Sequence, residues 1–276
     1  MSIQVQSDPI FKPEEKGSSM GRTSLEKRSS IMKIANLAGD LINPDEIIPE
    51  KRPSTQLPDG SVYDGEWIDN RREGYGVCVW PDGRKYKGAW KNDKREGFGK
   101  LSYREDYLCD PSGGEDEATV TYQGEWKEDE KHGYGVETRL NGDRYEGFFN
   151  NGKKHGKGTF TWSDGSAYVG DFLNGKVEGQ GKYTSPDGRE YEGSWEDGKK
   201  HGSGKHIWSD GRSYVGGYCH GKKHGQGVFI WQDGQKYDGE WKMGKQHGMG
   251  KFTSADGKES LGQWFEGEQR WKKPLK

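Results

Sequence analysis

The sequence predicts an all-β protein: an elongated open antiparallel meander of about eight to nine β-hairpins, preceded by a tail and one short helix. The first observation is a tyrosine that recurs every 23 residues through most of the chain. The second is that each repeat holds two segments of period two bounded by turn residues, the pattern of two strands. The third is a composition with only 28% hydrophobic residues but 11 Trp, 14 Tyr and 9 Phe, which favours a thin core built from rings.

The repeat is defined by tyrosine, glycine and aromatic residues at fixed positions. With the tyrosine as position 1, glycine occupies position 3 in all nine copies and positions 12 and 14 in all eight complete copies. Position 5 is aromatic in every copy, and we expect these rings to form one structural stripe. The stripe comprises Trp67, Trp90, Trp126, Phe149, Phe172, Trp195, Tyr218, Trp241 and Trp264. Such regularity predicts an array in which each hairpin contacts only its neighbours.

One copy, "YEGSWEDGKKHGSGKHIWSDGRS" (191–213), illustrates the expected hairpin. Its strands are the segments 191–195 and 202–208, "EDGKKH" is the loop between them, and "SDGRS" is the turn to the next copy. We expect position 5 to lie opposite position 12, position 3 opposite 14 and position 1 opposite 16. Positions 1 and 5 then share a face, and glycine beside each ring leaves room for it to lie over the backbone.

The segments before the array differ from the repeat. Residues 1–30 are polar and predict a flexible tail, 31–43 an amphipathic helix, and 44–56 a linker. Ser30 can cap the helix and Pro44 ends it. The apolar face of this candidate docking helix consists of Ile31, Ile34, Ala35, Ala38, Leu41 and Ile42. Two roles remain open: a lid over the exposed edge or aromatic face of the sheet, or a docking helix for a partner.

The array is predicted to span 57–271, followed by a C-terminal tail at 272–276. "LPDGSV" (57–62) resembles the end of a copy that precedes the first. An acidic insertion at 104–121 separates the second and third copies, and it is either a tolerated surface loop or a partner-specific contact. Ser260 replaces tyrosine in the ninth copy, which indicates a terminal half-copy that caps the array.

The copy at 191–213 closely resembles the MORN repeat, the membrane occupation and recognition nexus motif. The chain is similar to radial-spoke-head and cytoskeletal MORN proteins. The resemblance covers roughly residues 57–271. It implies a rod-like meander that serves as a scaffold or binding surface. MORN arrays occur in phosphoinositide kinases and junctional membrane proteins, and also in apicomplexan cytoskeletal proteins and radial-spoke heads. The resemblance therefore implies either a membrane or a cytoskeletal setting.

Several kinds of chemistry are disfavoured by the sequence. The formal charge of −2 gives no excess to drive nucleic-acid binding, and no apolar run approaches the roughly 20 residues that span a bilayer. Cys78, Cys109 and Cys219 fit no metal spacing and are interpreted as reduced thiols of the cytosol. Position 11 carries a histidine in five copies, but neighbouring hairpins lie about 10 Å apart, too far for two of these histidines to share a metal. We therefore predict no catalytic, cofactor-binding or metal-binding residues.

Basic residues at positions 9 and 10 predict a ridge along one edge of the rod. It attracts an anionic membrane or an acidic protein tail, or it only keeps the hairpin loops soluble. Acidic residues at positions 2, 4 and 7 offset much of its charge. The candidate ridge consists of Lys153, Lys154, Lys176, Lys199, Lys200, Lys222, Lys223 and Lys245.

We expect the protein to be a non-enzymatic scaffold that joins other proteins in a cytoskeletal assembly, with a ciliary or axonemal complex as the preferred setting. The alternative is a peripheral membrane adaptor that binds acidic phospholipids through the lysine ridge. We expect no cofactor and no nucleic-acid partner, and a location in the cytoplasm and cytoskeleton. Pairing of open sheet edges into a homodimer remains an open alternative.

Overall fold

The structure is a computed structural model that describes residues 48–104 and 120–275, and the predicted tail and helix at 1–43 lie outside these residues. The described residues form one sheet of 20 strands and contain no helix, which confirms the all-β antiparallel meander. The strands are β1 (Glu50–Lys51), β2 (Thr55–Gln56), β3 (Val62–Ile68), β4 (Arg71–Val79), β5 (Lys85–Lys91), β6 (Lys94–Tyr103), β7 (Val120–Lys127), β8 (Glu130–Arg139), β9 (Arg144–Asn150), β10 (Lys153–Thr161), β11 (Ala167–Leu173), β12 (Lys176–Thr184), β13 (Glu190–Glu196), β14 (Lys199–Ile207), β15 (Ser213–Cys219), β16 (Lys222–Ile230), β17 (Lys236–Lys242), β18 (Lys245–Thr253), β19 (Glu259–Phe265) and β20 (Glu268–Pro274).

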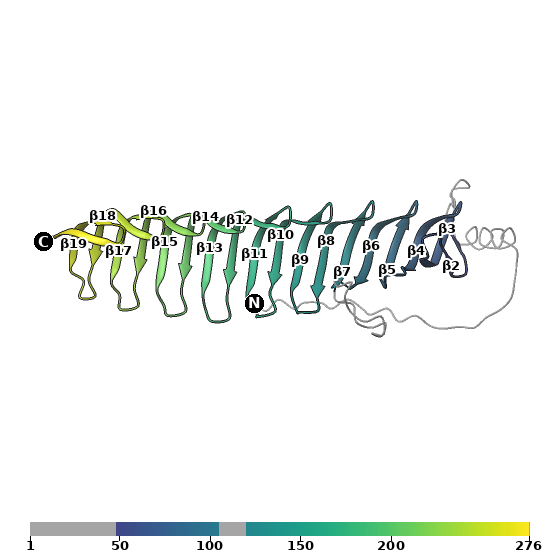
Figure 1. Cartoon of the computed structure of the whole chain (residues 1–276), viewed down its shortest axis with the longest axis horizontal. Helices are drawn as coiled ribbons and strands as arrows, with labels where there is room; N and C mark the ends of the chain where they lie inside the picture. The colour runs from purple at the N-terminus through teal and green to yellow at the C-terminus, as the bar shows by residue number, and fades with distance from the viewer. Residues whose placement is uncertain (1–47, 105–119, 276) are drawn as a thin grey trace, which may run out of the picture. The chain divides into compact units, whose positions relative to one another are not determined.

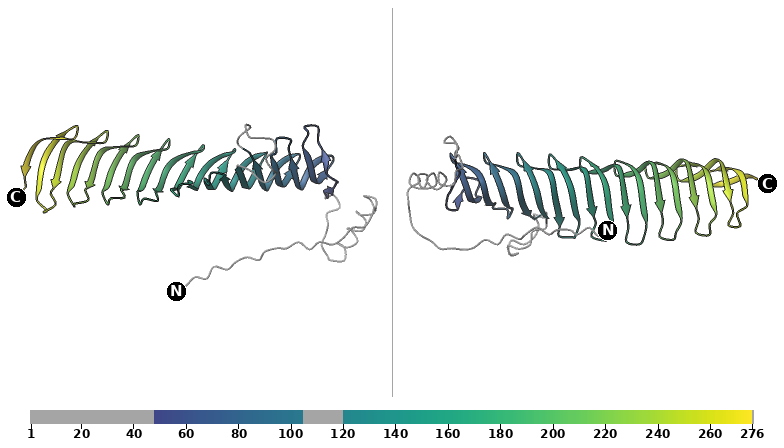
Figure 2. Two further views of the ribbon diagram at one scale, coloured as in Figure 1. Left: turned by 60° about the horizontal axis from the view of Figure 1, so that its bottom comes forward. Right: turned by 180° about the vertical axis from the view of Figure 1, so that it is seen from behind.

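From β3 onward each strand pairs antiparallel with the next, so nine hairpins follow one another along the sheet (Figure 1). The views of Figure 2 show the same succession from two further sides. The short strands β1 and β2 both pair with β3 and cover its outer edge. The chain from β2 into β3 makes the same turn as every copy boundary, so "LPDGSV" is the end of a preceding copy.

The hairpin loops are shorter than predicted. Only Asp197 and Gly198 form the turn between β13 and β14, with φ of 49° and 74°, and Lys199 already belongs to β14. Two consecutive residues at positive φ match the right-handed twist of the flanking strands. The first three copies place Asp, Asn or Glu at these two positions, and the later copies place glycine second.

The register within each hairpin contains a bulge that the sequence did not predict. Gly193 lies opposite Gly204 and Tyr191 opposite His206 as expected, but Trp195 lies opposite Lys200, at position 10 and not 12. The glycine at position 12 adopts positive φ, 61° at Gly202, and is looped out of the ladder. It pairs instead across the copy boundary, where Gly202 lies opposite Tyr218. From the second copy on, each position-5 residue therefore has glycine beside it, but from the preceding copy, whereas Trp67 of the first copy lies opposite Glu50.

The tyrosine at position 1 lies across a pair of glycines. A Cβ on Gly204 would lie 2.4 Å from the Tyr191 hydroxyl oxygen, and one on Gly193 would lie 2.9 Å from it. Tyr191 is completely buried, and its hydroxyl donates a hydrogen bond to the carbonyl oxygen of Ser194 at 3.0 Å. The hydroxyl of position 1 makes the same bond to position 4 in all eight complete copies. Both glycines are required: a side chain at Gly204 would displace the ring, and one at Gly193 would overlap the backbone of Ser203 and Gly204.

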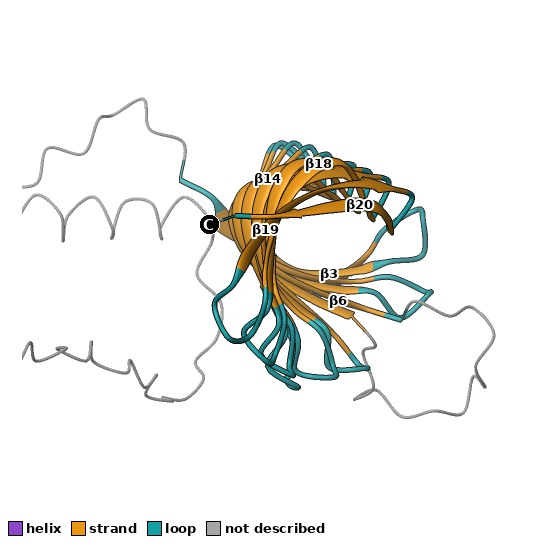
Figure 3. Cartoon of the chain, turned by 90° about the vertical axis from the view of Figure 1, so that its left-hand side faces the viewer, coloured by secondary structure: helices purple, strands orange, loops and turns teal. Residues whose placement is uncertain are grey.

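The rings at positions 1 and 5 form one unbroken ladder. Tyr191 contacts Trp195 of its own copy at 5.0 Å between centroids and Tyr218 of the next copy at 5.3 Å, both edge-to-face. Edge-to-face pairs are a favoured geometry for aromatic rings. The sequence of such contacts continues from Trp67 to Trp264, and eight of the nine position-5 rings are buried, Trp195 being half-buried. We call the side of the sheet that carries this ladder the aromatic face. Figure 3 shows how the strands curve when seen along the array.

The departures from the repeat leave the ladder intact. Strands β6 and β7 flank the insertion, yet Leu101 still lies opposite Tyr122, the register of every other copy boundary. Residues 120 and 121 already belong to β7, and residues 105–119 of the predicted insertion lie outside the described part. The ninth copy is a whole hairpin and not a half-copy, because residues 268–274, including part of the predicted C-terminal tail, form β20 against β19.

We predict that Gly204→Ala lowers the free energy of unfolding by about 1–3 kcal/mol, because its methyl group would overlap the Tyr191 ring. Gly198→Asn is the matched control: Asn70 and Asp93 occupy the equivalent turn position, so we expect a change of less than about 0.5 kcal/mol. Urea unfolding of both variants measures the difference. Equal effects at the two sites would show that the ring does not require the glycine.

Candidate functional site

The lysine ridge predicted from the sequence divides between the two faces of the sheet. Because positions 9 and 10 are consecutive residues of a strand, their side chains point to opposite faces. The position-9 lysines 153, 176, 199, 222 and 245 are exposed at the strand starts. Lys154, Lys200 and Lys223, at position 10, are half-buried over the aromatic rings. The eight residues therefore form no single surface.

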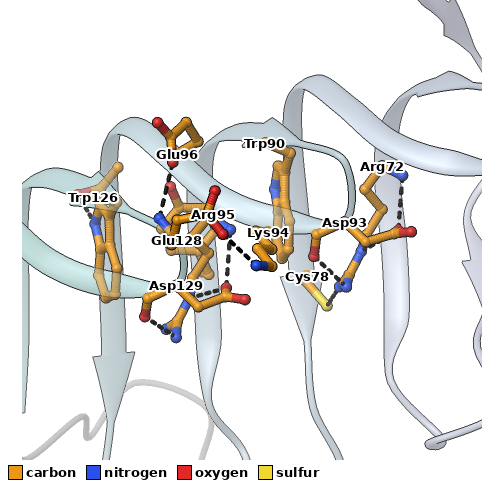
Figure 4. A network of polar contacts seen from close by, with 12 residues as sticks. Arg72, Cys78, Trp90, Asp93, Lys94, Arg95, Glu96, Trp126, Glu128 and Asp129 are labelled. Carbon is orange, nitrogen blue, oxygen red and sulfur yellow. Dashed lines mark hydrogen bonds and ion pairs between the residues drawn. The ribbon is translucent and has the colours of Figure 1, made fainter.

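At the N-terminal end the position-10 cation is an arginine held by a carboxylate (Figure 4). The Arg72 guanidinium lies 4.2 Å from the Trp90 ring centroid and donates from Nε to Asp93 Oδ1 at 3.2 Å. Arg95 repeats the arrangement with Trp126 and Asp129. In each pair the aspartate belongs to the turn of the next copy, so the cation connects two copies.

In the middle of the array two lysines share one buried carboxylate. Glu137, at position 16, is 9% exposed and lies 2.6 Å from Lys131 Nζ and 3.4 Å from Lys154 Nζ. Burial alone would raise the pKa of Glu137, but the two ammonium groups outweigh it and the pKa lies below its ordinary value. A buried carboxylate with two charged donors is satisfied and holds its neighbours in place.

Lys200 and Lys223 have no carboxylate partner among the described residues. Burial lowers the pKa of each lysine to about 8, with a further contribution from a nearby arginine. Lys223 is surrounded by rings, with Phe229 at 4.0 Å and Trp241 at 4.4 Å. Lys200 Nζ lies 3.2 Å from His206 Nδ1, and burial followed by the Lys200 charge lowers the pKa of His206 to about 4. This neutral imidazole accepts the lysine's hydrogen bond.

A cavity of about 300 Å³ adjoins Lys200 on the aromatic face. Val177 occupies position 10 in the fifth copy, where the flanking copies carry Lys154 and Lys200, so the shorter side chain leaves this space open. Rings of Trp162 and Trp195 line it. The cavity therefore combines apolar walls with an ammonium group that lacks a counter-ion.

The opposite face carries an open groove of about 1300 Å³ that crosses strands β8 to β15. Its floor is the backbone of the glycine pairs at positions 3 and 14, and its walls are side chains at positions 2, 4, 13 and 15. Apolar side chains in these walls are about half exposed: Tyr134 44%, Phe148 49%, Val169 55% and Val215 52%. We call this side of the sheet the groove face.

One cluster of possible metal ligands was not predicted. Glu196, His201 and His220 place their donor atoms within 4.8 Å of one another. The histidines that recur in the sequence lie at position 11, whereas His220 lies at position 7 of the following copy. The turn of that copy lies beside His201, because Gly221 N donates to Lys200 O at 2.8 Å. Only the register could have revealed this proximity.

The candidate docking helix at Ile31, Ile34, Ala35, Ala38, Leu41 and Ile42 lies outside the described residues. No described helix is both long and apolar enough to cross a bilayer.

Comparison with known proteins gives one family match. The family model described as MORN repeat matches residues 63–83, 86–105, 122–144, 145–167, 168–188, 191–211, 214–236 and 237–259. No curated protein sequence is significantly similar to the chain.

Among solved structures, the chain is similar to the SAS-4 (dCPAP) TCP domain of Drosophila melanogaster, in complex with a proline-rich motif of Ana2 (dSTIL). The identity is 11% and the TM-score 0.31, over 80% of this chain and 94% of that one. BamB from Moraxella catarrhalis aligns at 9% identity and a TM-score of 0.18, over 83% of this chain and 92% of that one. Both TM-scores are low, so only the family match bears on function.

We predict that Lys200→Met raises the free energy of unfolding at pH 7, because it removes a charged group from among the rings. Below about pH 8 Lys200 is protonated in both the folded and the unfolded wild type, so the substitution gives its full increase in stability. Above pH 8 Lys200 of the folded wild type loses its proton, whereas that of the unfolded chain keeps it up to the ordinary pKa. The stability difference between Lys200→Met and the wild type therefore becomes smaller.

Urea unfolding at pH 6, 7, 8 and 9 measures this difference. Arg72→Met is the control and should lower stability throughout, because Arg72 has its aspartate. A loss of stability in Lys200→Met at pH 7 would contradict the interpretation of Lys200 as an uncompensated charge.

Proposed function

The chain belongs to the MORN repeat family, and on this basis we propose that it is a scaffold whose groove face binds an elongated segment of a partner protein. MORN repeats suggest a role in binding proteins or membranes, and an all-β repeat fold of this kind is typically a non-enzymatic scaffold. Protein binding is the alternative that the geometry of the two faces supports better.

The observation that carries this proposal is the groove with its row of exposed apolar side chains. Folded proteins rarely expose aligned apolar residues unless the surface binds something. The Phe148 and Tyr134 rings contact each other at 5.7 Å between centroids. Val169 and Val215 lie in the same wall, two and six strands beyond Phe148. Charged walls of both signs, including Glu146 and Lys182, supply polar contacts at the rim.

The membrane alternative is weakened by the division of the lysines. An electrostatic membrane contact requires several cations on one exposed surface. Lys154, Lys200 and Lys223 are instead half-buried over rings, and Lys176 forms an ion pair with Asp197. The remaining exposed row has one lysine in each of five successive hairpins, and the apolar side chains near it, such as Leu173 and Met243, are scattered.

We propose a cytoskeletal assembly as the setting, with a ciliary or axonemal complex preferred and the cytoplasm as the location. This setting is supported by the resemblance of the repeat copies to those of radial-spoke-head and cytoskeletal MORN proteins. The partners would then be other proteins of that assembly.

We predict that Val169→Glu with Val215→Glu removes the partners recovered by affinity purification from cells, with a loss of at least about tenfold, because two carboxylates would be buried in the contact. Leu173→Glu is the matched control: it is 47% exposed on the same sheet but lies outside the groove. The control should keep its partners. Identical partner sets for all three chains would contradict binding through the groove.

We also predict that the chain fails to co-sediment with vesicles rich in phosphatidylserine at about 0.15 M salt. A variant with Lys153, Lys199, Lys222 and Lys245 changed to Glu tests the alternative. Wild-type binding that this variant abolishes would favour the membrane adaptor over the proposed scaffold.

A further inference from the structure

Three side chains with metal-binding groups converge between the sixth and seventh copies. Glu196 is the last residue of β13, His201 lies in β14, and His220 lies in the turn between β15 and β16. Their donor atoms all lie within 4.8 Å of one another. The His201 and His220 rings are 5.4 Å apart between centroids. The cluster therefore joins one hairpin to the turn of the next.

The contacts within the cluster leave His201 without a satisfactory partner. Its Nδ1 atom lies 2.8 Å from Glu196 Oε2, but the contact is not aligned as a hydrogen bond. Nδ1 is otherwise buried and unpaired. A buried ring nitrogen without a hydrogen bond is costly, and a metal ion bound between Nδ1 and the Glu196 carboxylate would satisfy both groups.

Among the described residues, only one junction between copies brings these three side chains together. It requires a carboxylate at position 6, a histidine at position 11, and a histidine at position 7 of the next copy. Histidine is frequent at position 11, but at position 7 it occurs only as His220, where Asn151 and Asn174 stand in the fourth and fifth copies. The Asn residues and His220 all adopt positive φ in the turn, 46° at His220. The turn therefore tolerates Asn at this position, and the imidazole adds a ligand.

We propose that Glu196, His201 and His220 form a zinc site that links the sixth and seventh copies. Two imidazoles and a carboxylate are ligands that zinc takes at about 2.0–2.2 Å, which places the ligand atoms about 3.4 Å apart in a tetrahedron. Closing from 4.8 Å requires small movements of Glu196 and His220, which are more exposed than His201. The fourth position is left for water or for a ligand from a partner.

Zinc bound here stabilises the folded chain, because the three ligands converge only when both copies are folded and paired. The site goes beyond the proposed scaffold function and does not depend on the groove, which lies on positions other than 6, 7 and 11. Copper and nickel would compete for the same ligands.

The test is a zinc titration of the metal-free full chain by calorimetry, compared with His220→Asn. We expect one site per chain with a Kd of about 10 µM or below, and at least a tenfold loss in the variant. Zinc should also raise the thermal midpoint of the wild type and not that of His220→Asn. Without zinc the two midpoints should agree, because Asn is native to the equivalent turn.

His224→Gln is the matched control, since His224 is a position-11 histidine outside the cluster. Its zinc affinity should equal that of the wild type. Cobalt substitution should give the intense visible absorption of a tetrahedral site in the wild type and in His224→Gln, but not in His220→Asn. A wild-type Kd above about 100 µM, or one unchanged by His220→Asn, would overturn the proposal.

Discussion

The contact on which the structure depends is the tyrosine ring that lies flat across two glycines. Tyr191 covers Gly193 and Gly204, and its hydroxyl satisfies the carbonyl of Ser194. The absence of two side chains lets the ring bury itself against the backbone, so a chain with few aliphatic residues still has a core. The backbone of the same glycine pairs forms the floor of the groove on the opposite face. The repeat motif therefore builds the core on one face and the groove on the other.

Functional differences among the copies arise at positions that this contact leaves variable. At position 10 the array changes from arginine paired with aspartate, to lysines that share Glu137, to lysines without a counter-ion. Each cation lies over the same ladder of rings, but its surroundings change with the residues at positions 8 and 16. A repetitive scaffold thus presents a different electrostatic surface at each point along its length.

The sequence was sufficient for the hairpins, their order and the common face of positions 1 and 5, because these follow from alternation and fixed spacing. It was not sufficient for the bulge, since the positive φ of Gly202 cannot be distinguished in sequence from the extended conformation of Gly204. Because of the bulge, the residue at position 5 pairs with position 10 and not with position 12. The surroundings of Lys200 could therefore not be predicted from the sequence. The proximity of His201 to His220 likewise depends on the pairing between copies. The proposed helix at 31–43 remains a prediction.

Native-state hydrogen exchange on Tyr168→Leu tests most directly whether the ring-on-glycine contact holds each copy to its neighbours. Leucine has comparable apolar bulk but neither covers both glycines as a flat ring nor donates to Asp171 O. We expect amide protection to fall in β11 and β12 and in the strands that pair with them, β10 and β13, while protection in β3 to β6 remains unchanged. Unchanged protection in β11 and β12, or an equal loss along the whole sheet, would contradict it.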